Sequence, residues 1–115
     1  MAYTVDVDTF ASVAINVAAG ATNAVLVAAP GAGKQIWVYG LSYTVNVAGT
    51  VSIQDSDDTA LSGVMPHAAN GGRVVAASGN IHMPLYKVAT NKALEMDTVT
   101  CEADGELTYA IATVS

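Results

Sequence analysis

The feature that most constrains the fold of this chain is the alternation of residue types from Gln35 to Val47. Large apolar or aromatic side chains occupy every second position, and small, mostly polar residues fill the gaps; the large ones are Trp37, Tyr39, Leu41, Tyr43, Val45 and Val47. Successive side chains of a β-strand point to opposite faces of a sheet, so this period of two predicts a strand with one buried face. We therefore expect Trp37, Tyr39 and Tyr43 to lie together in a core.

The rest of the chain divides into short strand candidates separated by turn-forming residues. In residues 10–17, Val13, Ile15 and Val17 are β-branched and spaced by two, which favours a strand over the helix that the neighbouring alanines would allow. The other predicted strands are residues 24–28, 34–47, 50–54, 59–64 (as a short strand or an irregular link), 73–77, 84–88, 93–101 and 106–114. About eight short strands with Gly and Pro turns predict an all-β fold, an antiparallel β-sandwich of jelly-roll type.

The length of the chain predicts a single domain. A chain of 115 residues buries one hydrophobic core, and we place this domain at residues 10–115. Cys101 is the sole cysteine, so no disulfide forms within the chain and we expect its thiol to be a small buried hydrophobe.

Residues 1–9 are expected to form an amino-terminal arm. Val5 and Val7 alternate with Asp6 and Asp8, a strand-like but acidic pattern that gains little from pairing inside its own sheet. The arm is expected instead to add a strand to the edge of a neighbouring subunit, with Val5 and Val7 as the partner-binding residues. A frayed terminus is the alternative.

Composition favours assembly with other proteins. Only 12% of the residues are charged and 52% are hydrophobic, chiefly Ala and Val. Soluble monomers usually keep their surfaces charged and their apolar patches small, so we expect part of the surface to be covered by copies of the chain or by a larger assembly. A well-packed monomer rich in Thr, Ser and Asn is the alternative.

The charge and the first residues argue against several partners. A net charge of −6 with only four cations is unsuited to nucleic acid or to an anionic membrane surface, because both require clustered Lys and Arg. Residues 1–8 carry acid where a signal peptide would carry base, and no apolar run approaches the roughly 20 residues of a membrane span. We expect a protein that is made and kept in a cytosol or released from one by lysis, with no nucleic-acid or membrane partner.

No motif in the sequence points to catalysis or to a cofactor. Residues 30–34, PGAGK, resemble part of a phosphate-binding loop, but Ala28 replaces its first Gly and Gln35 its hydroxyl residue, so we expect a turn. His67 and His82 have no metal ligand at a suitable spacing, and no Gly-x-Ser-x-Gly elbow occurs. We expect no enzyme activity, no cofactor, and no catalytic or metal-binding residues.

Two binding sites are open as alternatives. Asp55, Asp57 and Asp58 place three carboxylates in a short turn, as a calcium ion would require, although the rest of an EF-hand loop is missing and a solvated hairpin tip is the simpler interpretation. Aromatic side chains are also able to stack on sugar rings. The candidates for such a carbohydrate platform are Trp37, Tyr39, Tyr43, Tyr86 and Tyr109.

Several segments resemble small structural proteins of tailed bacteriophages. They are LSYTVNVAGTVSIQ (41–54), TALSGVMP (59–66), AANGG (68–72), ALEM (93–96) and GELTY (105–109). The resemblance covers roughly residues 24–115 and rests on patterns of strands and turns. It implies a jelly-roll or related β-sandwich that forms trimers, is not an enzyme, and sits on the outside of a capsid as a decoration or cement protein, or on a fibre or tail.

From the composition and this resemblance, we expect a bacteriophage virion structural protein. The main expectation is a homotrimeric capsid decoration protein, located in the virion, whose partners are its own copies and the major capsid protein that it stabilises from outside. The alternative is a phage fibre or tail component that binds host surface glycans. The chain shows no shaft, no coiled coil and no separate receptor domain, which favours decoration.

Overall fold

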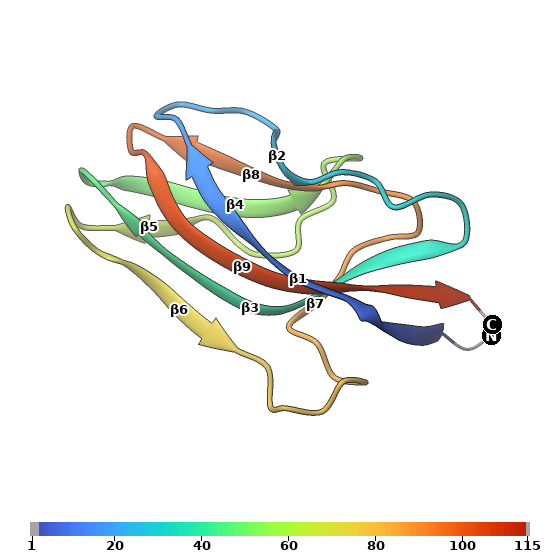
Figure 1. The fold of residues 1–115 in the computed structure, drawn as a ribbon. Helices are drawn as coiled ribbons and strands as arrows, with labels where there is room; N and C mark the ends of the chain where they lie inside the picture. The colour runs from blue at the N-terminus through green and yellow to red at the C-terminus, as the bar shows by residue number, and fades with distance from the viewer. Residues whose placement is uncertain (1–2, 115) are drawn as a thin grey trace.

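The computed structural model describes residues 3–114, which form nine β-strands in two antiparallel sheets packed face to face (Figure 1). The strands are β1 (Tyr3–Val17), β2 (Ala24–Val27), β3 (Lys34–Val45), β4 (Gly49–Asp55), β5 (Met65–His67), β6 (Gly72–Ala76), β7 (Tyr86–Lys87), β8 (Leu94–Val99) and β9 (Ala103–Val114). The predicted all-β sandwich is confirmed. In the part of the chain that the structure describes, no helix has the length and apolarity needed to cross a membrane.

The order of the strands is that of a jelly roll. The first and last strands, β1 and β9, are neighbours, and so are β2 with β8, β3 with β6, and β4 with β5. Such nested pairs arise when one long antiparallel ribbon is folded over on itself. The folding places β1-β9-β3-β6 in one sheet, called the large sheet below, and β2-β8-β4-β5 in the other, the small sheet.

The two-residue strand β7 continues the edge of the large sheet that β6 begins. β6 pairs with residues 40–44 of β3, and β7 pairs with Trp37 and Val38 of the same strand. Between them, residues 77–85 leave the sheet as a loop, which we call the edge loop. The amide of Ala77 donates to the Tyr39 carbonyl at 2.8 Å and that of Leu85 to the Val38 carbonyl at 2.7 Å, so both ends of the edge loop are fixed to β3.

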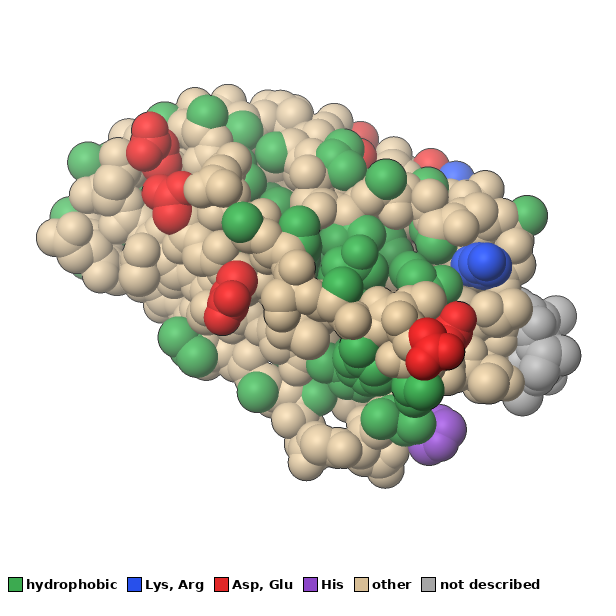
Figure 2. Space-filling view, viewed as in Figure 1, with side chains coloured by type: hydrophobic (Ala, Val, Ile, Leu, Met, Phe, Trp, Pro, Cys, Tyr) green, Lys and Arg blue, Asp and Glu red, His purple; other side chains and the backbone are tan. Residues whose placement is uncertain are grey.

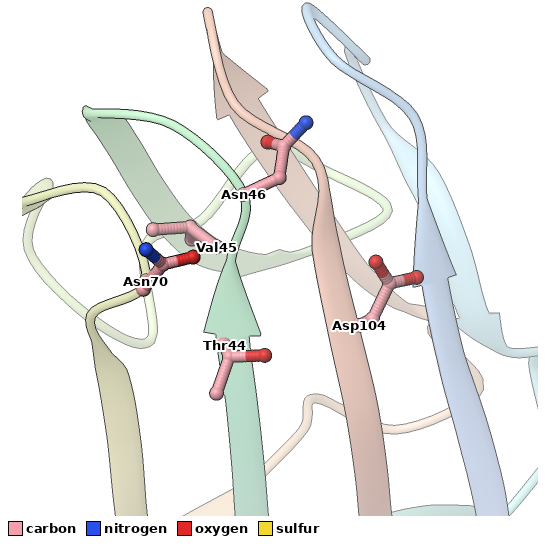
Figure 3. A pocket seen from close by; sticks show the side chains of 5 residues that line it. All are labelled: Thr44, Val45, Asn46, Asn70 and Asp104. Carbon is pink, nitrogen blue, oxygen red and sulfur yellow. The ribbon is translucent and has the colours of Figure 1, made fainter.

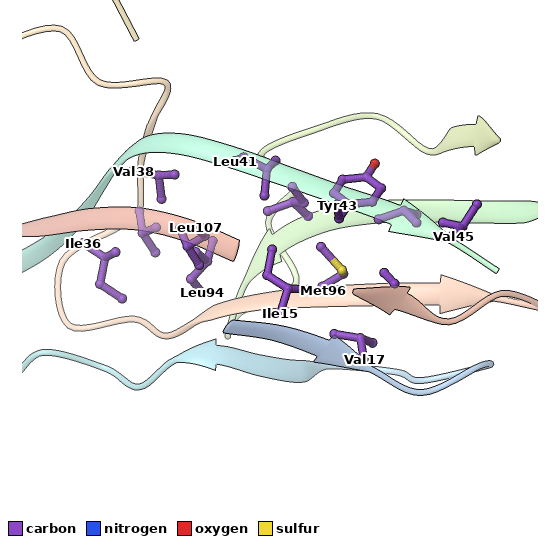
Figure 4. Close-up of a cluster of buried hydrophobic side chains, with 14 of the residues drawn as sticks. Ile15, Val17, Ile36, Val38, Leu41, Tyr43, Val45, Leu94, Met96 and Leu107 are labelled. Carbon is purple, nitrogen blue, oxygen red and sulfur yellow. The ribbon is translucent and has the colours of Figure 1, made fainter. Parts of the chain in front are cut away.

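The main core lies between the two sheets (Figure 4). Its buried residues are Ile15, Val17, Ile36, Val38, Leu41, Tyr43, Val45, Val51, Ile53, Val88, Leu94, Met96, Cys101, Ala103 and Leu107. Ile15 and Val17 of the predicted strand at residues 10–17 point inward, and the predicted burial of the free thiol of Cys101 is confirmed. The alternation of residue types therefore predicts the inward-facing side chains wherever a strand keeps its register, because inward residues are two apart.

A bulge in β3 changes which residues face the core. The register between β3 and β9 shifts between Val38 and Gly40, so Val38 and Leu41 both point inward although they are three residues apart. The prediction that Trp37 shares a face with Tyr43 is therefore wrong. Tyr43 lies in the main core, whereas Trp37 packs in a second cluster on the other face of the large sheet. A shift of one residue moves every following side chain to the opposite face, and a glycine such as Gly40 is a common mark of such a bulge.

The amino-terminal segment belongs to the sheet of its own chain. Tyr3–Asp6 pairs with β9, and after a register shift residues 11–17 pair with the other half of β9. The expectation that this segment avoids its own sheet is wrong, because β9 is long enough to hydrogen-bond it and Val5 gains burial against Trp37. Residues 1 and 2 of the predicted arm lie outside the described residues.

Residues 59–64 form an irregular link, the second of the two predicted alternatives. Residues 59–64 contribute only an isolated bridge between Ala60 and Gln54, and the strand that closes the small sheet, β5, comes later. The amides of Leu61 and Ser62 both donate to the carbonyl of Ile53, at 2.8 and 3.0 Å. These two bonds hold the chain in a tight bend, so it does not run as a strand here.

Candidate interaction surface

The outer face of the large sheet carries a second apolar cluster, called the outer aromatic cluster below. Its members are Tyr3, Val5, Trp37, Tyr39, Ala110 and Ala112, and Phe10 joins it through its ring. Val5 lies opposite Ala112, and Trp37 lies opposite Ala110, both on the middle strand β9. Small side chains on the middle strand leave space above the sheet, and the aromatic rings of the flanking strands fill it.

The ring of Trp37 is enclosed although it lies on an outer face. The Tyr3 ring packs against it with 6.2 Å between centroids, and Lys87 Nζ lies over the ring, 4.6 Å from its centroid. The indole Nε1–H donates to Gln35 Oε1 at 2.9 Å. Only 3% of Trp37 is exposed. The residue is therefore the centre of a small core and not an open platform.

The tyrosine hydroxyls of the cluster are hydrogen-bonded within the chain. The hydroxyls of Tyr3 and Thr90 lie 2.8 Å apart, and the Tyr39 hydroxyl donates to the carbonyl of Ile81. Burial raises the pKa of Tyr39, so this hydroxyl keeps its proton for the bond. The bond ties the edge loop to the outer aromatic cluster.

Exposed apolar side chains surround this cluster, and we call them the apolar rim. They are Val7 and Phe10 on β1, with exposed fractions of 59% and 38%, and Ile81 and Met83 in the edge loop, with 39% and 62%. Phe10 contacts Tyr39 with 4.9 Å between ring centroids, and the Tyr39 hydroxyl donates to Ile81, so these two members join the rim to the cluster. Figure 2 shows hydrophobic side chains gathered from the middle of the molecule to the edge loop.

The two predicted partner-binding residues are therefore in different positions. Val5 is 8% exposed and packs in the outer aromatic cluster, whereas Val7 stands in solvent at the rim. Sequence reasoning missed Phe10, Ile81 and Met83. The signal for the last two was the pair of large apolar residues in a loop between Gly79 and Pro84, because loops seldom carry such residues without a contact.

The other half of the same outer face is polar. Asp104, Glu106 and Thr108 project from β9 there, and the hydroxyls of Ser12 and Thr108 lie 3.2 Å apart. A shallow hollow of about 330 Å³ lies at the end of this half (Figure 3). It is lined by Thr44, Val45, Asn46, Asn70 and Asp104. This lining offers one carboxylate and neutral amide and hydroxyl groups.

Two of the three carboxylates of the turn after β4, those of Asp55 and Asp57, are bound within the protein, and Asp58 is exposed. Asp55 is buried, and its Oδ1 accepts the amides of Asp57 and Thr59 at 2.8 and 3.0 Å. Asp57 forms an ion pair with Lys92 at 3.0 Å. Over residues 3–114, no group of three or more His, Cys, Asp or Glu side chains is placed to hold a metal ion.

The remaining candidates have structural roles. Lys34 donates its amide to the Gly31 carbonyl at 3.2 Å, which confirms the turn predicted for PGAGK. His67 Nε2 lies 2.8 Å from the hydroxyl of Tyr43. Burial raises the pKa of Tyr43 to about 12, although the charge of Arg73 acts in the opposite direction. The amide of His82 donates to Asn80 within the edge loop.

Glu95 is a buried acid that sequence reasoning missed. It lies on the outer face of the small sheet between Val25 and Gln54, it is 7% exposed, and its Oε1 has no hydrogen-bond partner among residues 3–114. The Gln54 amide donates instead to Asp97 at 3.0 Å, and to Asn23. Burial raises the pKa of Glu95, and the nearby carboxylates Asp58, Asp97 and Asp55 raise it further. The sequence signal was a Glu between two core residues of one strand.

Comparison with known proteins finds no family model, no curated protein and no solved structure that matches this chain.

Proposed function

We propose that this chain is a structural protein of a bacteriophage virion: a homotrimeric capsid decoration protein that binds the major capsid protein from outside and stabilises the shell. The jelly-roll order of the strands, the scarcity of charge and the resemblance of its strand and turn segments to phage structural proteins support the proposal. The observation that carries it is the apolar rim around the outer aromatic cluster.

The apolar rim has the properties of a binding surface. Soluble monomers rarely expose contiguous large apolar side chains, and interfaces are enriched in aromatic residues and Met. Phe10 and Ile81 are both attached to Tyr39, which is itself packed in the cluster, so the rim is held in place before binding. A surface that is already ordered loses little conformational entropy when a partner docks.

Stabilisation of a shell by this surface needs no chemical step. A protein that binds only the assembled shell stabilises it by RT ln(1 + [L]/Kd), about 2.7 kcal/mol per site when the free concentration is roughly 100 times Kd. A capsid repeats the same site many times, so the effects of individual sites add together. Rigid packing under the rim is the structural requirement for such binding.

The test compares two exposed surfaces of the folded protein. Purified protein is mixed with shells of the same phage that lack it, and binding is measured by co-sedimentation and by the melting temperature of the shells. The double substitution Ile81→Asp with Met83→Asp is expected to weaken binding at least about tenfold, because it places charge in an apolar contact. Val64→Asp is the matched control, because Val64 is also exposed but lies outside the rim.

The proposal would be contradicted if the wild-type protein left the melting of the shells unchanged. It would also be contradicted if the double variant bound as tightly as the control. In both cases the melting of the isolated protein shows that it is folded.

A fibre or tail component that binds host surface glycans is the alternative function. The outward direction of Trp37 and Tyr39 favours it, since sugar rings stack on aromatic faces. A sugar would have to displace Tyr3 or Lys87 from the Trp37 ring, and this is why the function is placed second. Titration of the Trp37 fluorescence with host surface polysaccharide tests it, and saturable quenching would favour the alternative.

A further inference from the structure

We propose that residues 11–17 of β1 pair with the same residues of a second copy of this chain, so that the large sheet continues across a two-fold axis at Ala14. The proposal concerns the edge of the large sheet and not the apolar rim. It goes beyond the proposed function and does not depend on it.

Three of the four sheet edges carry features that block pairing with another strand. The β6–β7 edge is interrupted by the edge loop. β2 has four residues and a register shift between Val25 and Val27, and β5 has three residues with Pro66 at its centre. Short strands, bulges and prolines are the usual protections of exposed edges. β1 is the fourth edge, and β9 is its only strand partner among residues 3–114.

The two halves of β1 differ in protection. In the amino-terminal half, Asp6 and Asp8 are exposed and the register with β9 is broken between Asp6 and Ala11. From Ala11 to Val17 the register is unbroken, and the segment ASVAINV contains no charge, no Pro and no Gly. Seven residues of strand give a free row of backbone groups about 23 Å long. A long, straight, uncharged edge of this kind is a template for another strand.

Charge and side-chain size select a second copy as the partner strand. The chain carries a net charge of −6, so most contacts between copies bring like charges together, but residues 9–33 contain no charged side chain. An antiparallel pairing centred on Ala14 places Val13 opposite Ile15 towards the cores, and Ser12 opposite Asn16 on the outer face. Ala14, which is exposed, meets its own copy at the axis without crowding. Paired β-branched residues and paired polar residues both stabilise antiparallel strands.

This contact has the symmetry of a dimer. An isologous contact about a two-fold axis uses the same patch on both copies, whereas a trimer needs a heterologous contact about a three-fold axis. If the proposed trimer also forms, the β1 edges join trimers in pairs. The edge therefore predicts an even number of chains per particle, and the proposed function predicts a multiple of three.

The first experiment measures particle mass by light scattering at micromolar concentration. Ala14→Lys is expected to reduce the mass of the wild-type particle by about half, because two like charges meet at the axis while the exposed position leaves the fold intact. Val74→Lys is the control, since Val74 is 82% exposed on the opposite edge strand β6, and its mass is expected to equal that of the wild type. An odd number of chains in the wild type, or an unchanged mass for Ala14→Lys, would overturn the proposal.

The second experiment detects the register by disulfide cross-linking. With the axis at Ala14, the two sulfurs of an Ala14→Cys variant lie on directly opposed residues, whose Cα atoms are about 4.5 to 5.5 Å apart and within the range that a disulfide spans. Mild oxidation is expected to give a covalent dimer on a non-reducing gel. Ser12→Cys mixed with Asn16→Cys is expected to cross-link, whereas the wild type, whose single Cys101 is buried, is not. A folded Ala14→Cys variant that stays uncross-linked would overturn the proposal.

Discussion

The outer face of the large sheet has two halves built on the same strands, and they differ in how they meet solvent. In one half β9 presents Ala110 and Ala112, and aromatic side chains of β1 and β3 close over them. In the other half β9 presents Asp104, Glu106 and Thr108, and the face stays open to water. The difference shows that the residue type on the middle strand decides whether its neighbours build a small core or a polar surface.

The aromatic half also explains how the long strands extend beyond the sandwich. Figure 1 shows the paired ends of β1 and β9 reaching past the strands of the small sheet. Burial of Trp37 and Val5 on the outer face stabilises the extended strands from the other side. The strands of the polar half pack on the small sheet through their inner face, so their outer face needs no apolar cluster to stabilise them.

The largest expected effect that tests this comparison is that of Trp37→Ala. Truncation of a buried Trp leaves a cavity, so we expect the free energy of unfolding to fall by about 3 to 5 kcal/mol, measured by urea denaturation. Thr44→Ala in the polar half is the control and should change it by about 0.5 kcal/mol or less. A loss below about 1 kcal/mol for Trp37→Ala would show that the outer aromatic cluster is not a core.

The second prediction concerns the small residues of the middle strand. Ala110→Leu adds volume opposite Trp37 in the outer aromatic cluster, where the alanine is fully buried, and we expect overpacking to cost about 1 to 3 kcal/mol. Glu106→Leu places the same leucine at an exposed position of the same strand and should cost far less. Equal losses in the two variants would remove the distinction between the halves.

Most of the fold could be predicted from the sequence because local patterns determine it. Ile15 and Val17 are β-branched and two residues apart, and turn residues such as Gly31 and Gly33 separate the strands. The face of Trp37 could not be predicted in this way. The alternation runs unbroken through Tyr39 and Gly40, so it does not reveal the bulge that depends on how β3 pairs with a strand far along the chain.

The candidate surface was predicted only in part, because it too depends on how distant segments of the chain pair. Of the two predicted partner-binding residues Val7 is exposed, but Val5 is buried because Trp37 and Ala112 come from distant segments to cover it. The edge loop carries Ile81 and Met83 outside any strand, where no periodicity indicates their exposure. Long-range pairing therefore decides which apolar residues form a surface.

The third prediction extends the comparison to the outer face of the small sheet, where Glu95 is buried without a partner for Oε1. Its pKa is raised in the folded state, so the folded protein holds this proton more tightly than the unfolded chain. The charged carboxylate therefore destabilises the folded protein fully at a pH above the folded pKa. As the pH falls through the folded pKa towards the unfolded pKa, Glu95 becomes protonated and the destabilisation is relieved. Glu95→Gln should thus raise the free energy of unfolding at pH 7 by roughly 1 kcal/mol.

The measurement for Glu95 is the pH dependence of urea denaturation. The difference in the free energy of unfolding between Glu95→Gln and the wild type should shrink as the pH falls through the folded pKa of Glu95. Glu102→Gln is the control, because Glu102 is exposed, and the difference for that variant should be small at every pH. A constant difference for Glu95→Gln would show that its charge does not oppose folding.

The smallest expected effect is that of the ammonium group above the Trp37 ring. Lys87→Met keeps most of the apolar stem but removes the charge, so it should lose only the cation–π attraction, about 0.5 to 1 kcal/mol by urea denaturation. Lys87→Ala also uncovers the ring and should lose more. Lys92→Met is the matched control, because Lys92 pairs with Asp57 at the surface and such pairs contribute about 0 to 1 kcal/mol that salt screens. The loss for Lys87→Met should persist at high salt because the ring and the ammonium group are in contact. A loss that disappears with salt, as for the control, would assign the Lys87 ammonium group to the charged surface and not to the outer aromatic cluster.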